Sequence, residues 1–283
     1  PTKAPQVNSR TATTAADTSN DLVYGGGRVA TSPAVYLVFW GSQWSQSDPY
    51  ATYLRNFLQG LAVGDGWTNV VQQYCEGVPV GTVFCGTNGT HIGVASGSIL
   101  KGIWWDNALP AVPLTTYPLK APVAGADTVA AEAVAAAAHF GNTAPGANVN
   151  AQYVIALPPH TPSPGEGVLY CSYHSTVTSN YGQIAYTNLP YQTDLGPLCG
   201  QGAVNSPGTY DGVSIVEGSE FIDTITDMDP PLGWVDATGQ EAAAKCTAVG
   251  PMGDITTATG TFAVLAIWSN EANGGAGACV MSG

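Results

Sequence analysis

The acidic side chains gather in one stretch of the chain, between Ser214 and Cys246. Of the 20 acidic residues, seven lie in this segment: Glu217, Glu220, Asp223, Asp227, Asp229, Asp236 and Glu241. Residues three and four apart are neighbours on a helix, which puts Glu220, Asp223 and Asp227 on one stripe. Carboxylates this close repel one another unless they share a proton or bind a cation. The pattern therefore indicates a site for acid–base chemistry or for cation binding.

Clustered carboxyl groups of this kind can carry out hydrolysis. A carboxyl pair that shares one proton supplies both an acid and a base at low pH. We predict that Glu220 is the general base and that Asp223 and Glu241 are its carboxyl partners. Ser219 directly precedes Glu220 and is a candidate hydrogen-bond donor or nucleophile. His174, in the segment YCSYHS, is a candidate donor that orients or polarises the substrate.

Two other interpretations of the acidic segment remain open. Carboxylate oxygens bind hard cations such as calcium, so the segment is also a candidate cation site, although its spacing is not that of an EF-hand loop. A solvated acidic face is the third interpretation, but Ile215, Phe221 and Ile222 on the same segment indicate a packed helix. Further candidate binding residues lie along the segment: Glu217, Asp227, Trp234 and Asp236.

The low content of charged residues limits the partners of the chain. Of its 283 residues, 10% are charged, and 7 basic residues against 20 acidic ones give a net charge of −13. So few cations argue against nucleic acid as a partner, and no apolar run approaches the ~20 residues that span a bilayer. A surface with few cations also has little charge repulsion once its carboxylates are protonated. We therefore expect an acid-tolerant protein with neither nucleic acid nor membrane as a partner.

The cysteine pattern indicates an exported protein. Six cysteines, at positions 75, 85, 171, 199, 246 and 279, show no C-x-x-C spacing. An even number in this pattern predicts disulfides and an oxidising compartment, and the pairing of sequence neighbours is the simplest of the possible connectivities. Residues 1–20 are polar and without periodicity, which is typical of a flexible leader. No linker divides residues 21–283, so these are predicted to form a single domain.

The elements that must position the candidate residues follow from the apolar pattern. Strands are predicted at five runs of apolar residues: 34–40, 151–157, 168–172, 183–187 and 262–268. Helical spacing predicts helices at 48–61, at the alanine-rich segment 126–140 and at the acidic segment 211–227. Strands that alternate with helices indicate an α/β (α+β) fold. We expect a twisted mixed sheet packed by the alanine-rich helix and the acidic helix.

Several motifs, taken in order, resemble the EXORDIUM/phosphate-induced protein family and most closely its secreted bacterial and fungal relatives. The matching segments are Leu22-Val23-Tyr24-Gly25-Gly26, residues 34–41 with Trp44, residues 170–175, Gly233-Trp234-Val235-Asp236, Glu241 and Cys246. In those relatives the late helix reads H-E-x-x-E and is followed by T-D. Here the corresponding residues are Ser219-Glu220-Phe221-Ile222-Asp223 and then Thr226-Asp227. The resemblance covers most of the chain from Leu22 onward.

The resemblance implies a zincin-like domain, in which the histidine of the late helix binds zinc and the adjacent glutamate is the general base. Ser219 stands in place of that histidine, and Asp223 in place of the second glutamate. A serine hydroxyl is a poor zinc ligand, which disfavours a tight zinc site. The expectation for a cofactor is therefore either none or a harder divalent cation held by Glu217, Glu220, Asp223 and Glu241.

Three functions are consistent with these residues. The first is a secreted, acid-tolerant and monomeric hydrolase, an endopeptidase that acts on protein or peptide substrates. The second is a non-catalytic extracellular binding or signalling protein on a degenerate metallopeptidase scaffold. The third is a carboxyl-dependent glycoside hydrolase, with sugars stacked on exposed tryptophans, for which the candidates are Trp44, Trp67, Trp104 and Trp105.

Overall fold

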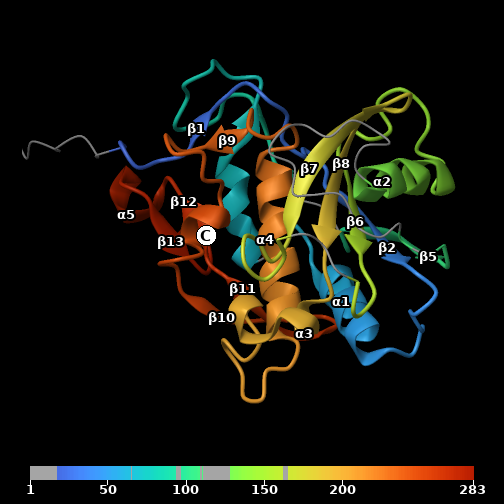
Figure 1. Ribbon diagram of the computed structural model, residues 1–283. Coiled ribbons are helices and arrows are strands. Elements are labelled where there is room, and N and C mark those ends of the chain that lie inside the picture. The colour runs from blue at the N-terminus through green and yellow to red at the C-terminus, as the bar shows by residue number, and fades with distance from the viewer. Residues whose placement is uncertain (1–17, 65, 94–96, 109, 111–127, 162–164) are drawn as a thin grey trace, which may run out of the picture.

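A central mixed sheet with helices on both faces forms the core of the computed structural model (Figure 1). The structure describes residues 18–64, 66–93, 97–108, 110, 128–161 and 165–283. The expected α/β class is confirmed at this level. The predicted leader, residues 1–20, lies outside the described residues except for its last three positions.

The central sheet has five strands in the order β5-β2-β6-β8-β7. These are β5 (Leu100–Asp106), β2 (Ala34–Trp40), β6 (Ala151–Ala156), β8 (Gly182–Leu189) and β7 (Tyr173–Ser179). The first four run parallel, and β7 runs antiparallel to β8 at one edge. Strands β2 and β6 are covered on both faces, which explains why each reads as a continuous apolar run.

One predicted strand, at residues 168–172, is wrong. Strand β7 begins only at Tyr173. The preceding residues turn back on themselves, because the Leu169 N–H donates to the carbonyl of Gly165 (2.7 Å) and a disulfide ties Cys171 to Cys199. The disulfide thus holds this short apolar run in a loop, and the pattern of apolar residues along the sequence does not reveal that link.

Helices cover the two faces of the sheet differently. The alanine-rich α2 (Thr128–His139) packs on one face, where its small buried side chains allow close approach. Helices α1 (Pro49–Gly60) and α4 (Asp211–Thr226) lie on the other face. Helix α1 begins after Asp48, whose carboxylate caps it by accepting from the N–H groups of Tyr50 and Ala51. The acidic segment is therefore a packed helix and not a solvated face, since most residues of α4 are buried.

The shorter elements complete the described chain. The short helices are η1 (Gly66–Gln73), α3 (Gln192–Leu195), η2 (Gly196–Cys199), η3 (Ala244–Cys246) and α5 (Ala272–Gly275). Strand β1 (Val23–Tyr24) pairs with β9 (Trp234–Val235), and β3 (Cys75–Glu76) pairs with β4 (Thr90–His91).

The predicted strand at residues 262–268 divides into two strands outside the central sheet. Strand β11 (Gly260–Leu265) pairs with β10 (Met252–Thr257), and β12 (Ile267–Ser269) pairs with β13 (Ala278–Val280). The apolar residues of this run join the core that contains α1 and α4. A continuous apolar run is therefore compatible with burial against helices as well as with burial in a central sheet.

Three disulfides tie the loops to this framework: Cys75–Cys85, Cys171–Cys199 and Cys246–Cys279. The pairing of sequence neighbours is the one found. Within the part of the chain that the structure describes, no helix has the length and apolar character that crossing a bilayer requires.

Candidate functional site

The imidazole of His174 lies between two glutamates from different parts of the chain. Its Nδ1 is 3.2 Å from Oε2 of Glu220 on α4, and its Nε2 is 3.1 Å from Oε1 of Glu241, which precedes η3. The three side chains are 6%, 14% and 18% exposed, respectively. The structure thus brings three of the predicted catalytic residues together in a partly buried cluster, here called the His174 cluster.

The alternation of β7 explains why His174 faces α4. Tyr173 and Val177 pack into the core with α2, so the intervening His174 points to the opposite face of the sheet. Helix α4 packs across that face and contacts β7, which brings Glu220 to the imidazole. Both partners are fixed by regular elements, and the geometry of the pair is therefore well determined.

His174 is a cation in this environment. Burial alone lowers the pKa of His174, but the attraction of Glu241 and Glu220 outweighs burial and holds that pKa well above its usual value. An imidazolium carries a proton on both nitrogens and has no lone pair to offer a metal ion. In this arrangement His174 is thus paired with carboxylates and does not present a ligand atom to a cation.

Ser172 is a member of the cluster that the sequence reasoning missed. Its hydroxyl donates a hydrogen bond to Oε1 of Glu220, the oxygen that does not face His174. The predicted Ser219 is placed differently, because its hydroxyl donates to the carbonyl of Ile215 one turn earlier on α4 (2.8 Å). A usable signal was present, since Ser172 and His174 are two residues apart in the sequence, the spacing that places side chains on one face of an extended chain.

Asp223 anchors the segment that carries Glu241. Its carboxylate accepts hydrogen bonds from the N–H groups of Ala243 (2.5 Å) and Ala244 (3.0 Å). Burial and the nearby charge of Glu241 raise the pKa of Asp223 well above its usual value, although His174 and the Ala243 N–H act in the opposite direction. By its contacts Asp223 is therefore a residue that positions Glu241.

Two further carboxyl groups flank the cluster. Glu217 is fully buried, and neither of its carboxyl oxygens has a hydrogen-bond partner among the described residues. Burial and then the charge of Glu220 raise the pKa of Glu217 well above its usual value, which favours its neutral form. Asp227 accepts from the N–H groups of Gly233 (2.8 Å) and Asp229 (3.2 Å). Its pKa is raised to about 7, by burial first and by Glu241 second.

Two of the predicted binding residues serve the fold and do not join the cluster. Trp234 is fully buried, and its indole N–H donates to the carbonyl of Cys75 (2.9 Å). Asp236 pairs with Lys245 (2.5 Å) and accepts from Thr238. Burial acts to raise the pKa of Asp236, but its hydrogen bonds outweigh burial and lower that pKa below its usual value.

A second carboxyl pair lies on the opposite face of the sheet. Burial, followed by the charge of Asp106 and a hydrogen bond with it, raises the pKa of Glu132 to about 8. Glu132 belongs to α2 and Asp106 ends β5, so the shared proton links a helix to the sheet edge. This pair is separate from the His174 cluster.

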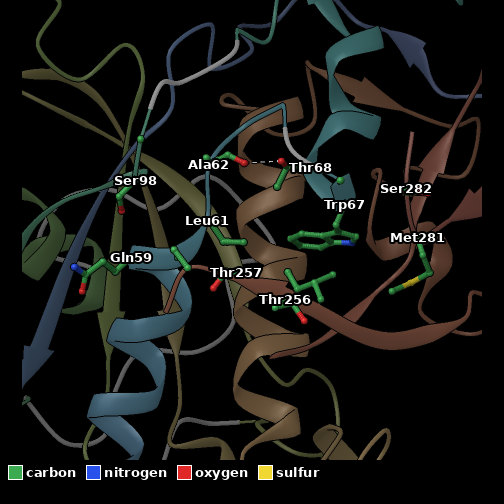
Figure 2. A pocket seen from close by; sticks show the side chains of 15 residues that line it. Gln59, Leu61, Ala62, Trp67, Thr68, Ser98, Thr256, Thr257, Met281 and Ser282 are labelled. Atoms are coloured by element: carbon green, nitrogen blue, oxygen red, sulfur yellow. Dashed lines mark hydrogen bonds between the residues drawn. The ribbon is translucent and has the colours of Figure 1, made fainter. Parts of the chain in front are cut away.

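Two other features of the described chain lie apart from the His174 cluster, a cavity and a group of potential metal ligands. A cavity of about 600 Å³ is lined by residues that include Leu61, Trp67 and Thr257, and none of its lining side chains titrates (Figure 2). Cys75, Cys85 and His91 are as close as metal ligands, but a disulfide joins the two cysteines and removes their thiolates.

The tryptophans considered for sugar stacking are not free platforms. Trp44 and Trp67 are buried, and their indole N–H groups donate to the carbonyls of Ala156 and Leu265. Trp105 stacks on Phe39 with ring centroids 4.2 Å apart, and Trp104 stacks on the ring of His139 at the same separation.

Comparison with known proteins finds no match: no protein-family model, no curated protein and no solved structure is similar to this chain. None of these comparisons links the chain to the EXORDIUM family, so that resemblance stays a prediction.

Proposed function

We propose that this chain is a secreted hydrolase that cleaves polypeptides at acid pH through the His174 cluster. The supporting observation is the connected series of side chains from Ser172 to Glu220, then to His174 and Glu241. A hydroxyl becomes a nucleophile when it donates a hydrogen bond to a carboxylate base and a third group fixes the orientation of that base.

In this proposal the hydroxyl of Ser172 attacks the carbonyl carbon of the substrate, and Glu220 accepts its proton. Glu220 then returns the proton to the departing amine, and a water molecule releases the acyl group by the same steps. His174 holds Glu220 in place, and Glu241 holds His174. Glu220 keeps the role of general base that its position in the acidic segment suggested, while Ser172 takes the nucleophilic role considered for Ser219.

Activity in acid follows from the charge of the cluster. A mechanism with a neutral histidine base fails below about pH 6, because that base becomes protonated. In this proposal His174 acts in its protonated form, which acid preserves. The chain also has only 7 basic residues, which limits charge repulsion when its carboxylates are protonated.

Export and the scaffold are parts of the same proposal. Three disulfides are typical of proteins from oxidising compartments. In this proposal the mixed sheet, with α2 and α4 on its two faces, is a zincin-like scaffold. Ser219 stands where the resemblance implies a zinc-binding histidine, and both nitrogens of His174 face carboxylates. These two features support hydrolysis without zinc.

The test is cleavage of an unfolded protein substrate at pH 3 and pH 7, with and without a chelator. We expect acid-optimal cleavage that the chelator does not inhibit. Ser172→Ala and Glu220→Gln should each lower kcat by about a thousandfold or more. Ser219→Ala is the matched control and should keep wild-type kcat. Wild-type activity in Glu220→Gln would refute this mechanism, and zinc-dependent recovery after chelation would refute the metal-free route.

A non-catalytic binding protein is the second candidate, and the low exposure of the cluster favours it. Glu220 and Glu241 are 14% and 18% exposed, which leaves little of either carboxylate open to a substrate. This alternative would be supported if the normally folded chain cleaved no protein substrate at any pH tested.

A further inference from the structure

Three large apolar side chains stand exposed in the two segments that the Cys171–Cys199 disulfide joins. Val168, Leu169 and Leu198 are 87%, 77% and 79% exposed. Single exposed apolar residues are ordinary, but a group of them on one surface commonly marks an interaction site. These three residues are here called the apolar rim.

The backbone beneath the apolar rim is fastened in place. The Gly167 N–H donates to the carbonyl of Tyr170 (2.8 Å), and the side-chain amide of Gln192 donates to the carbonyl of Cys171 (3.0 Å). The disulfide brings the Cα atoms of Cys171 and Cys199 to 5.5 Å. These bonds and the disulfide fix the backbone on either side of Leu169 and join it to the segment that carries Leu198.

The apolar rim lies beside the His174 cluster. Ser172 directly follows Cys171 and donates to Glu220 on α4, and residues 165–172 pass in front of α4 in Figure 1. Consecutive Cα atoms are about 3.8 Å apart, so the Cα of Leu198 lies at most about 13 Å from that of Ser172. An extended peptide advances about 3.3 Å per residue, so the rim is within about four substrate residues of the reacting bond.

We propose that the apolar rim binds apolar side chains of a polypeptide substrate next to the bond that is cleaved. This inference rests on the proposed function, because it assigns a substrate preference to the same site. At neutral pH a second copy of the chain is a poorer occupant, since each copy carries a net charge of −13 and the two repel. At acid pH this repulsion fades, so the occupant there is assigned from the nearness of the rim to the His174 cluster. The rim thus selects substrates by burial of leucine-like side chains.

The experiment measures peptide binding separately from turnover. The full-length chain with Ser172→Ala is titrated against two labelled ten-residue peptides, one with leucines and one with serines at the same positions, by fluorescence anisotropy. Leu169→Ser with Leu198→Ser is added to this background. The matched control adds Val80→Ser with Val149→Ser, which removes two exposed valines elsewhere on the surface.

We expect the rim variant to bind the leucine peptide about tenfold more weakly and the serine peptide unchanged, while the control pair has no effect. Equal affinity of the rim variant and its parent for the leucine peptide would overturn the inference. So would self-association of the wild-type chain that the rim substitutions abolish, because a second copy would then be the occupant.

The two proposals fail in different ways. If the leucine peptide binds through the rim but the wild-type chain turns over no peptide, the hydrolase is refuted and the binding surface stands. If turnover occurs but leucine and serine peptides give equal kcat/KM with and without the rim substitutions, the rim is refuted and the hydrolase stands.

Discussion

Replacement of Asp227 by asparagine should flatten the dependence of stability on pH. Burial and the charge of Glu241 raise the pKa of Asp227 from 3.8 to about 7, against the lowering effect of His174 and two backbone N–H groups. A carboxyl group whose pKa is raised by folding stays protonated in the folded chain, while the unfolded chain already ionises. The contribution of Asp227 to the stability of the fold is therefore greatest below about pH 4 and is lost as pH rises toward 7.

The size of the effect follows from the shift. Each pKa unit corresponds to about 1.4 kcal/mol, so a shift of about three units costs up to about 4 kcal/mol once Asp227 must ionise. About half of this loss, roughly 2 kcal/mol, falls between pH 5 and pH 7. Asparagine keeps the oxygen that accepts from Gly233 and Asp229 but cannot ionise, so the variant should escape this loss.

The assay is urea unfolding at pH 5, 6 and 7, followed by tryptophan fluorescence and extrapolated to water. Between pH 5 and 7 the free energy of unfolding of the wild type should fall more steeply than that of Asp227→Asn, by about 2 kcal/mol. Glu271→Gln, which removes an exposed carboxyl, is the control and should keep the wild-type slope. Identical slopes for Asp227→Asn and the wild type would show that Asp227 does not titrate in this range.

Two further substitutions test how the segment after α4 is held. Gly233→Ala should destabilise the fold by about 3 kcal/mol, because the added Cβ would lie 2.5 Å from the Cα of Asp227, and urea unfolding at pH 5 would measure the loss. Asp236→Asn should lower the free energy of unfolding at pH 7 by about 2 kcal/mol through loss of its bond to Lys245. Folding lowers the pKa of Asp236, so its contribution is present above pH 3.8 and is lost as pH falls below that value. The free energies of unfolding of Asp236→Asn and of the wild type should therefore differ less at pH 3 than at pH 7. An equal difference at both pH values would contradict this explanation.

Much of the framework could be predicted from the sequence. Residues 34–40 and 151–157 read as buried strands because both faces of those strands are covered, and apolar side chains are needed at every position. The alanine-rich segment reads as a helix and is observed as α2, although residues 126 and 127 lie outside the described chain. These features depend on local propensity and burial, which a single segment expresses by itself.

The partners of those elements were not predictable in the same way. Residues 262–268 read as one core strand but divide between β11 and β12, because an apolar run does not specify whether a sheet or a helix buries it. Residues 168–172 read as a strand but form a loop, because the link from Cys171 to Cys199 overrides a weak local preference.

The candidate site shows the same division. The residue types of Glu220, Glu241 and His174 already indicated acid–base chemistry when read along the chain. Only the tertiary structure decided that Glu220 and Glu241 face opposite nitrogens of one imidazole, and that Ser172 rather than Ser219 meets Glu220. The physical reason is that spacing along the chain determines which side chains share a face of one element, whereas packing between elements determines which faces meet.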